Sequence, residues 1–216
     1  MLLKAEIIDE YNKGRIVIEP FNIDNVGPNS YDVSLSDTLK VYTSETLDVK
    51  KVNPTRTIKI PEEGLFLEPF KLYLGATIEK AGSDYYIPGY DGRSSQAING
   101  IMSHVSAGLG YIGFKSNWTL EILVIHPIRV YAGMRIGQVF FTDVNQKFNI
   151  PSNRYNGKYT DQPLPQASKS YLDWDIPSLP QVTPNSTTTP MDNISPNSTT
   201  TPISVTTTSN KLYWGC

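Results

Sequence analysis

A carboxylate and a hydroxyl-rich cationic turn are the parts of this sequence best suited to chemistry. Glu121 stands in the strand-like segment 118–122, and the turn Gly92-Arg93-Ser94-Ser95 precedes it. A positioned carboxylate can take a proton from water and later deliver it to a leaving group. Arginine and serine donors can bind phosphate oxygens through hydrogen bonds, which are stronger when charge-assisted. These residue types suit hydrolysis at the base of a phosphorylated nucleotide.

The cysteine and histidine content restricts how such a site could activate water. The single cysteine is Cys216, and the histidines are His104 and His126. Zinc-dependent base deaminases need a histidine or cysteine together with a cysteine pair around the metal. These residues are too few for that set, so the sequence predicts that a carboxylate activates water without zinc. A lone cysteine also excludes an intramolecular disulfide.

The elements that must position these residues are mainly of the β type. Short segments rich in β-branched and aromatic residues alternate with Gly, Pro, Asn and Asp, which predicts many strands joined by turns. A first helix is expected at 7–12, and a second at 94–101, where Ser95 could act as the cap and leave N–H groups for an anion. This pattern favours an all-β domain with short helices, of the jelly-roll or barrel type. The predicted strands are 16–18, 31–35, 39–42, 56–60, 72–78, 119–125, 128–131 and 136–141.

An ordered series of motifs runs along the chain to about residue 175. The motifs are Pro28-Asn29-Ser30-Tyr31-Asp32, Gly92-Arg93-Ser94-Ser95, His104-Val105-Ser106-Ala107-Gly108, Thr119-Leu120-Glu121, Ile136-Gly137-Gln138 and Tyr155-Asn156-Gly157-Lys158-Tyr159. Their order and spacing resemble the dCTP deaminase branch of the trimeric dUTPase superfamily. The resemblance implies a distorted, dUTPase-like jelly roll that forms a homotrimer with active sites between subunits.

The same resemblance implies a role for each motif residue. Glu121 and Ser94 are the expected catalytic residues: Glu121 activates the attacking water, and Ser94 orients the base or the water. The backbone near Ala107 holds the exocyclic group of the base. The implied ligand is dCTP or dUTP, with Mg²⁺ sharing the charge of the triphosphate, and the implied reaction converts dCTP and water to dUTP and ammonia. The residues expected to bind the triphosphate are Arg93, Ser95, Gln138, Tyr155, Lys158 and Tyr159.

Three positions differ from the family's pattern. Ile98 replaces an arginine beside the catalytic glutamate, which removes electrostatic stabilisation. Tyr111 replaces an aspartate that positions water at the α-phosphate, which argues against pyrophosphate release. Ser116 replaces a glycine, and the sequence offers no interpretation of that change.

Two kinds of function therefore remain open. One is a divergent dCTP deaminase in which Lys115 or Arg135 supplies the missing positive charge. The other is a catalytically silent trimer of the same fold, reused as a structural or recognition protein, for example in a virus particle. An enzyme of this kind is expected in the cytoplasm, that of the host if the chain is viral, whereas a structural protein is expected in the virion.

Composition and charge narrow the range of partners. The 216-residue chain has a formal net charge of −2, which provides no basic surface for duplex nucleic acid. A run of about 20 apolar residues, as a membrane span requires, is missing from the sequence, and the N-terminus does not resemble a signal peptide.

The composition changes after the predicted β domain, residues 1–176. Residues 177–216 are rich in Thr, Ser, Asn and Pro, so they cannot bury enough apolar surface to offset the loss of chain entropy and are expected to form a linker. Asn185 and Asn197 lie in glycosylation sequons. The segment ends in Leu212-Tyr213-Trp214, an aromatic anchor that could dock on a protein partner.

Overall fold

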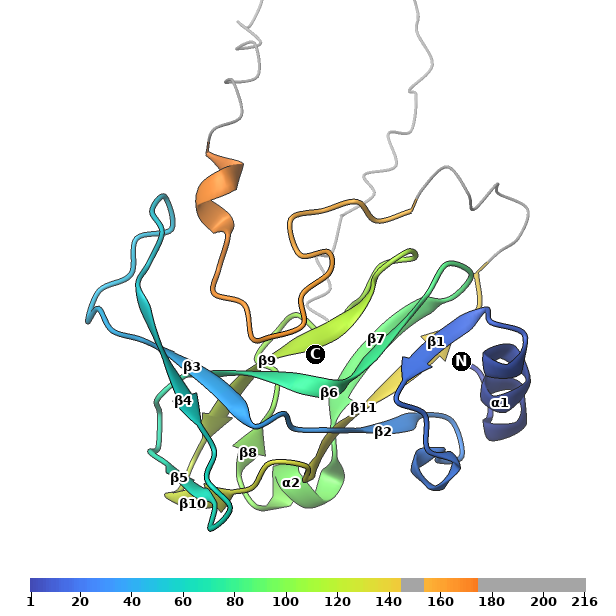
Figure 1. Ribbon diagram of the computed structural model, residues 1–216, viewed down its shortest axis with the longest axis horizontal. Coiled ribbons are helices and arrows are strands. Elements are labelled where there is room, and N and C mark those ends of the chain that lie inside the picture. The colour runs from blue at the N-terminus through green and yellow to red at the C-terminus, as the bar shows by residue number, and fades with distance from the viewer. Residues whose placement is uncertain (145–153, 175–216) are drawn as a thin grey trace, which may run out of the picture. The chain divides into compact units, whose positions relative to one another are not determined.

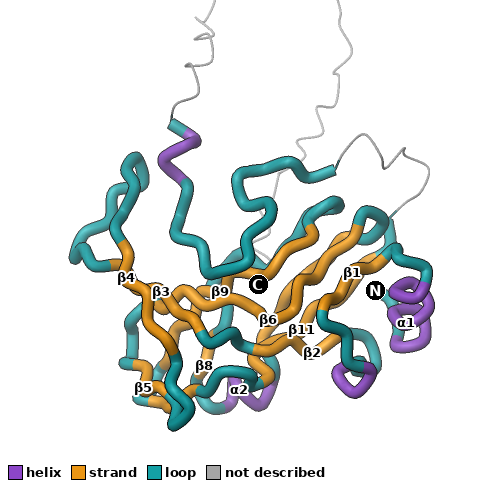
Figure 2. Tube along the Cα trace, viewed as in Figure 1, coloured by secondary structure: helices purple, strands orange, loops and turns teal. Residues whose placement is uncertain are grey.

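The computed structural model describes residues 1–144 and 154–174, which form antiparallel β-sheets with two short α-helices (Figures 1 and 2). Short 3₁₀-helices, labelled η, complete the described elements. In chain order these are α1 (Lys4–Asn12), β1 (Ile16–Glu19), η1 (Ile23–Asn25), β2 (Tyr31–Ser34), β3 (Thr38–Tyr42), β4 (Thr55–Lys59), β5 (Leu65–Leu67), β6 (Tyr73–Ser83), β7 (Ile87–Gly92), α2 (Ser94–Ile98), β8 (Ile101–Met102), β9 (Lys115–Val124), β10 (Ile128–Val130), β11 (Arg135–Thr142) and η3 (Ser170–Asp173).

The largest sheet contains the strand that carries Glu121. Its strand order is β4-β3-β6-β9-β8, and β1 also pairs with β6. Strands β6 and β9 pair antiparallel, so that Leu74 lies opposite Glu121 and Ala81 opposite Ser116. A second sheet has the order β2-β11-β7, and β10 pairs with β5. Glu121 therefore lies on a strand that has β6 on one side and β8 on the other.

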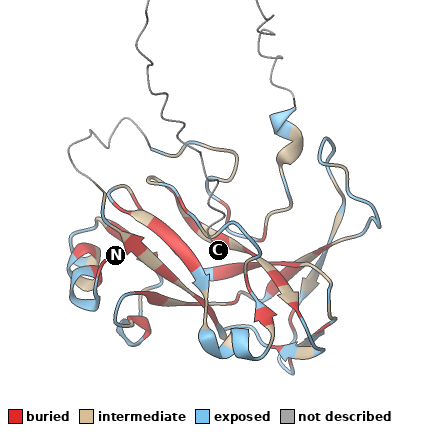
Figure 3. Ribbon diagram, turned by 180° about the vertical axis from the view of Figure 1, so that it is seen from behind, coloured by how far each residue is buried: buried red, intermediate tan, exposed pale blue. Residues whose placement is uncertain are grey.

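Burial along β9 shows why this segment forms a strand. Buried and partly exposed residues alternate along it, and Leu120 and Ile122 are fully buried. Because side chains alternate with a period of two, Thr119 and Glu121 point to the other face. Burying an aliphatic side chain of this size contributes about 1.5–3 kcal/mol. The buried residues of the larger sheets join in one hydrophobic core, visible as red segments along the strands in Figure 3.

The predicted all-β domain with short helices is confirmed, and the predicted strands are present with shifts at their ends. Strand β7 was not predicted, because its sequence Ile-Pro-Gly-Tyr-Asp-Gly contains residues that weaken strands. The second helix stops at Ile98, two residues before Gly100, whose φ of +78° suits a helix end. The expected cap by Ser95 is wrong, because the N-cap residue of α2 is Arg93.

Some predictions are not tested by the described residues. The linker at 177–216, with its sequons and aromatic end, lies outside them, and the jelly-roll class and the trimer stay predictions. In the parts of the chain that are described, no helix is long and apolar enough to cross a membrane.

Candidate active site

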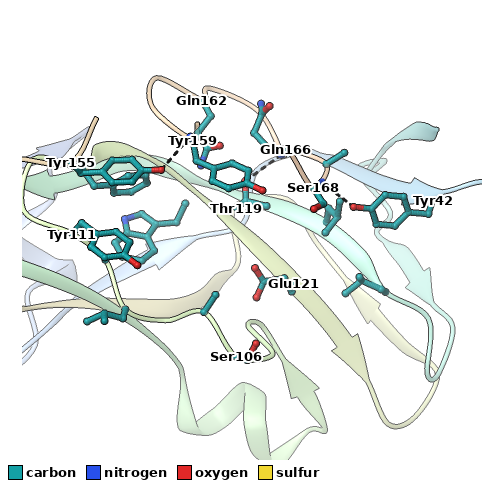
Figure 4. A pocket seen from close by; sticks show the side chains of 18 residues that line it. Tyr42, Ser106, Tyr111, Thr119, Glu121, Tyr155, Tyr159, Gln162, Gln166 and Ser168 are labelled. Carbon is teal, nitrogen blue, oxygen red and sulfur yellow. Dashed lines mark hydrogen bonds between the residues drawn. The ribbon is translucent and has the colours of Figure 1, made fainter. Parts of the chain in front are cut away.

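A pocket of about 650 Å³ contains the carboxylate of Glu121 (Figure 4). Glu121 enters it from β9, and Ser106 and Ala107 enter it from the loop between β8 and β9. Figure 4 shows Glu121 directed into the space between this loop and the C-terminal segment that carries Gln162 and Gln166. The volume lies in the range of small-molecule sites, which are mostly apolar with a few placed polar groups. The apolar and aromatic lining residues are Tyr42, Leu72, Leu74, Leu109, Tyr111, Phe114, Trp118, Tyr155 and Tyr159.

One hydrogen bond orients the Glu121 carboxylate. Its Oε2 accepts from the backbone N–H of Val105 at 3.2 Å. Within residues 1–144 and 154–174, the salt bridges include none to Glu121, and the two cations proposed to replace the missing arginine are engaged elsewhere. Lys115 pairs with Asp84 at 2.7 Å, and Arg135 lies 3.6 Å from Asp32. Neither cation is paired with Glu121 within one chain, and their assistance to Glu121 stays a prediction.

Buried groups beneath the pocket fix the loop that supplies the Val105 N–H. The Tyr90 hydroxyl donates to Ser103 Oγ at 2.8 Å, and the Tyr90 N–H donates to the carbonyl of Gly108 at 2.8 Å. Burial raises the pKa of Tyr90 well above its usual range, so the phenol stays neutral. Glycine at position 108 lets the loop backbone approach β7 closely, because a Cβ there would lie 2.5 Å from the Tyr90 carbonyl oxygen. The loop is thus held from both ends near Glu121.

A second polar cluster lies where the β2-β11-β7 sheet meets the start of α2. Arg93 lies 3.1 Å from a carboxylate oxygen of Asp32, which also faces Arg135. Gln138 on β11 accepts a hydrogen bond from Ser30 Oγ at 2.7 Å, and its amide nitrogen donates to the carbonyl of Gly92. Ser94 and Ser95, the first residues of α2, are exposed beside these groups. This cluster gathers donors suited to an anionic ligand.

The structure divides the predicted site residues into two groups. One group lines the pocket: Glu121, Ala107, Tyr155 and Tyr159. The other lies outside the pocket lining: Arg93, Ser94, Ser95 and Gln138. Lys158 also lies outside the pocket lining, and its Nζ pairs with Asp173.

Two glutamines that the motifs did not single out also line the pocket. Gln162 and Gln166 come from the C-terminal segment. Gln162 is only 6% exposed, and its Oε1 is buried without a hydrogen-bond partner in the described structure. Its proximity in sequence to Lys158-Tyr159 was the signal that could have identified it. A buried acceptor without a partner beside a pocket is a candidate contact for a ligand donor.

Two of the positions that differ from the family's pattern are exposed. Ile98, at the end of α2, is 85% exposed. Tyr111 lines the pocket, and its ring stacks on Tyr155 with centroids 5.3 Å apart and an interplanar angle of 8°. The described residues contain no group of three or more His, Cys, Asp or Glu side chains that could hold a metal ion.

The fold and the pocket together define a mostly antiparallel β protein with a carboxylate in a tyrosine-lined site. Residues 1–144 match the dCTP deaminase-like family. A protein of Clostridium acetobutylicum named "dCTP deaminase, dUMP-forming" is 45% identical over 174 residues, which cover 81% of this chain and 99% of that protein. The protein of the same name from Leptospira biflexa is 46% identical over 175 residues, with the same coverage of 81% and 99%. The chain therefore belongs to the dCTP deaminase-like family, as the motifs indicated.

A solved structure supports the fold. The crystal structure of 2'-deoxycytidine 5'-triphosphate deaminase from Agrobacterium tumefaciens is similar with a TM-score of 0.54 and 18% sequence identity. The similarity covers 66% of this chain and 47% of that chain.

Proposed function

We propose that this protein binds dCTP and deaminates it, with Glu121 as the group that activates water. The observation that carries the proposal is the placement of the Glu121 carboxylate, oriented by the Val105 N–H, in a pocket of about 650 Å³. The family membership and the names of the relatives from Clostridium and Leptospira support dCTP as the substrate.

The proposed mechanism needs one carboxylate at the base. Glu121 takes a proton from water as the oxygen adds to C4 of cytosine and passes it to the ring nitrogen; it then takes the proton of the new C4 hydroxyl and passes it to the departing amino group. The Ser94 hydroxyl orients the base or the water, and the backbone near Ala107 holds the exocyclic amino group. The C4–N bond then breaks, so that dCTP and water give dUTP and ammonia.

The triphosphate is assigned to the cationic residues and the tyrosines of the motifs, together with Mg²⁺. Arg93 and Lys158 are paired with Asp32 and Asp173, and these pairs are partly exposed. Exposed ion pairs contribute only about 0–1 kcal/mol, so a phosphate can replace the carboxylate partner at low cost. Ser95, Gln138, Tyr155 and Tyr159 complete the proposed phosphate contacts.

A homotrimer would complete this site. Glu121 lines the pocket whereas Arg93 and Ser94 lie outside its lining, so we infer that each site joins the pocket of one chain to the α2 turn of another. Exposed apolar side chains near both parts, such as Ile98, Leu109 and Val105, would then be covered.

Subunit mixing tests the shared site. Glu121→Gln and Arg93→Ala proteins are each expected to be inactive. After joint unfolding and refolding, mixed trimers should regain activity, because some sites combine an intact Glu121 with an intact Arg93. If mixing restores nothing although light scattering shows a trimer, the site lies within one chain.

The proposed product is dUTP, although the relatives are named dUMP-forming. Release of pyrophosphate needs a carboxylate to position water at the α-phosphate, and Tyr111 cannot serve as one. The test is chromatography of the products from dCTP, with and without Mg²⁺. Formation of dUTP supports the proposal, and formation of dUMP would show that another group positions the second water.

A second candidate function is a catalytically silent trimer that binds the nucleotide. It is favoured by the exposed Ile98 and the stacked Tyr111, which stand where the resemblance places an arginine and an aspartate. Binding of dCTP without release of ammonia would support it. A role in a virus particle stays a prediction from the C-terminal composition, and we place a deaminase in the cytoplasm, with the deoxynucleotides.

A further inference from the structure

The C-terminal segment 154–174, which we call the strap, crosses the Glu121 pocket without joining a sheet (Figure 4). Pro163 and Pro165 have no backbone N–H, so the strap lacks two of the donors that a strand would use to pair in a sheet. Side-chain oxygens instead accept hydrogen bonds from its backbone N–H groups. These bonds are Tyr159 N–H to Tyr155 hydroxyl (3.2 Å), Gln162 N–H to Ser116 Oγ (2.7 Å), Gln166 N–H to Thr119 Oγ1 (3.2 Å), Ser168 N–H to Tyr42 hydroxyl (3.0 Å) and Lys169 N–H to Tyr159 hydroxyl (2.9 Å).

Ser116 makes the most buried of these attachments. Its hydroxyl accepts from the Gln162 N–H at 2.7 Å and donates to the Gln162 carbonyl at 3.2 Å. Ser116 is 3% exposed and Gln162 is 6% exposed. One hydroxyl thus satisfies both backbone groups of a strap residue, which glycine, the residue expected at this position from the motif pattern, cannot do.

Tyr111 fixes the start of the strap in a different way. Its ring stacks on Tyr155, and the Tyr155 N–H donates to the carbonyl of Ile112 at 2.6 Å. Phe114 packs against the same tyrosine at 6.0 Å. An aromatic pair of this kind adds stabilisation beyond its buried area. Two positions at which this chain differs from the family's pattern therefore both contact the strap.

We propose that Ser116 and Tyr111 latch the strap over the Glu121 pocket, with Ser116 as a positioning residue that sets where Gln162 rests. Ser116 itself does not line the pocket, so it acts through the strap. Because the described hydrogen bonds from the strap to the β domain run mainly through side chains and form no β-ladder, the strap can open without disrupting a sheet. The latch then controls how fast a ligand enters and leaves; that the ligand is dCTP rests on the proposed function.

Hydrogen exchange of the full-length protein without nucleotide tests the latch. In Ser116→Ala the Gln162 amide should exchange about tenfold faster than in the wild type, as expected for loss of a buried hydrogen bond. Ser170→Ala is the matched control, since it removes an exposed strap hydrogen bond to the Val49 carbonyl. The control should leave exchange at Gln162 within about twofold, and equal exchange in Ser116→Ala and the wild type would overturn the latch.

The wild type provides a second reading if Ser116→Ala does not fold. The Gln162 amide, held in a buried hydrogen bond, should exchange more slowly than the Gln166 amide, whose bond to Thr119 is partly buried. Exchange at Gln162 as fast as in an open loop would contradict the proposal.

Stopped-flow binding of dCTP, followed by tryptophan fluorescence, tests control of access. Both the association and the dissociation rate constants should rise about threefold or more in Ser116→Ala and stay unchanged in Ser170→Ala. Faster exchange with unchanged nucleotide kinetics would refute control of access. If the wild type does not bind dCTP, the proposed substrate is wrong, and the exchange result still decides whether the latch exists.

Discussion

Replacing Ile98 by arginine tests whether a missing cation limits the deamination. Ile98 is 85% exposed within one chain, so an arginine there should change the free energy of unfolding of that chain by no more than about 0.5 kcal/mol. In the proposed trimer the same position would face the Glu121 pocket of a neighbouring chain. A unit charge about 4 Å from the developing charge is worth about 4 kcal/mol at an effective dielectric constant of 20. Side-chain freedom and the water that remains at a subunit boundary reduce this value. We expect about 1.4–2.8 kcal/mol, which is a factor of about 10–100 in kcat.

The assay is ammonia release from saturating dCTP by the purified protein. Ile98→Met is the matched control, since it keeps an apolar side chain of similar size, and its kcat should equal that of the wild type. Ile98→Arg should be about 10–100 times faster. If arginine changes nothing, or if methionine accelerates the reaction equally, the missing charge is not what limits turnover.

Three further predictions concern stability. Gly82→Ala should lower the free energy of unfolding by about 1–3 kcal/mol or more, measured by urea denaturation, because its Cβ would lie 1.8 Å from the carbonyl oxygen of Phe114; an unchanged stability would show that the strands separate easily. Burial raises the pKa of Glu79, and a hydrogen bond from the Ser34 N–H opposes this shift only in part. Because the pKa in the folded protein lies above the ordinary value of 4.5, this carboxyl contributes stability below pH 4.5 and loses that contribution as pH rises through its folded-state pKa. Glu79→Gln should therefore be more stable than the wild type at neutral pH but not below pH 4.5, and denaturation at both pH values checks this. Deleting residues 183–216 should leave the melting temperature of the β domain unchanged, whereas a large drop would mean that this segment packs into the fold.

Local patterns in the sequence predicted the framework of the site. The alternation around Leu120 placed Glu121 on a strand with its side chain away from the core, and the structure agrees. Strand β7 escaped prediction because its proline and glycines act as turn signals, and only pairing with β11 reveals its role. Local sequence thus identified strands whose apolar and polar side chains alternate. It did not identify β7, which is a strand because it pairs with β11.

Long-range contacts explain what the sequence could not show about the site. Motif order associates Arg93 with Glu121, yet the two lie in different clusters of one chain. The hydrogen bond between Ser116 and Gln162 joins residues 46 positions apart, so neither residue alone signals it. The replacement of glycine by Ser116 can be interpreted only when the structure shows that the strap passes beside this residue.

The most direct test of the central claim is the comparison of Glu121→Gln with the wild type for both dCTP turnover and dCTP binding. Glutamine keeps an oxygen that can accept from the Val105 N–H but cannot carry the proton. We predict that kcat for ammonia release falls by about 10²–10⁴, while the Kd for dCTP changes by no more than about threefold. Comparable turnover by the two proteins would show that Glu121 does not activate water and would contradict the proposed mechanism.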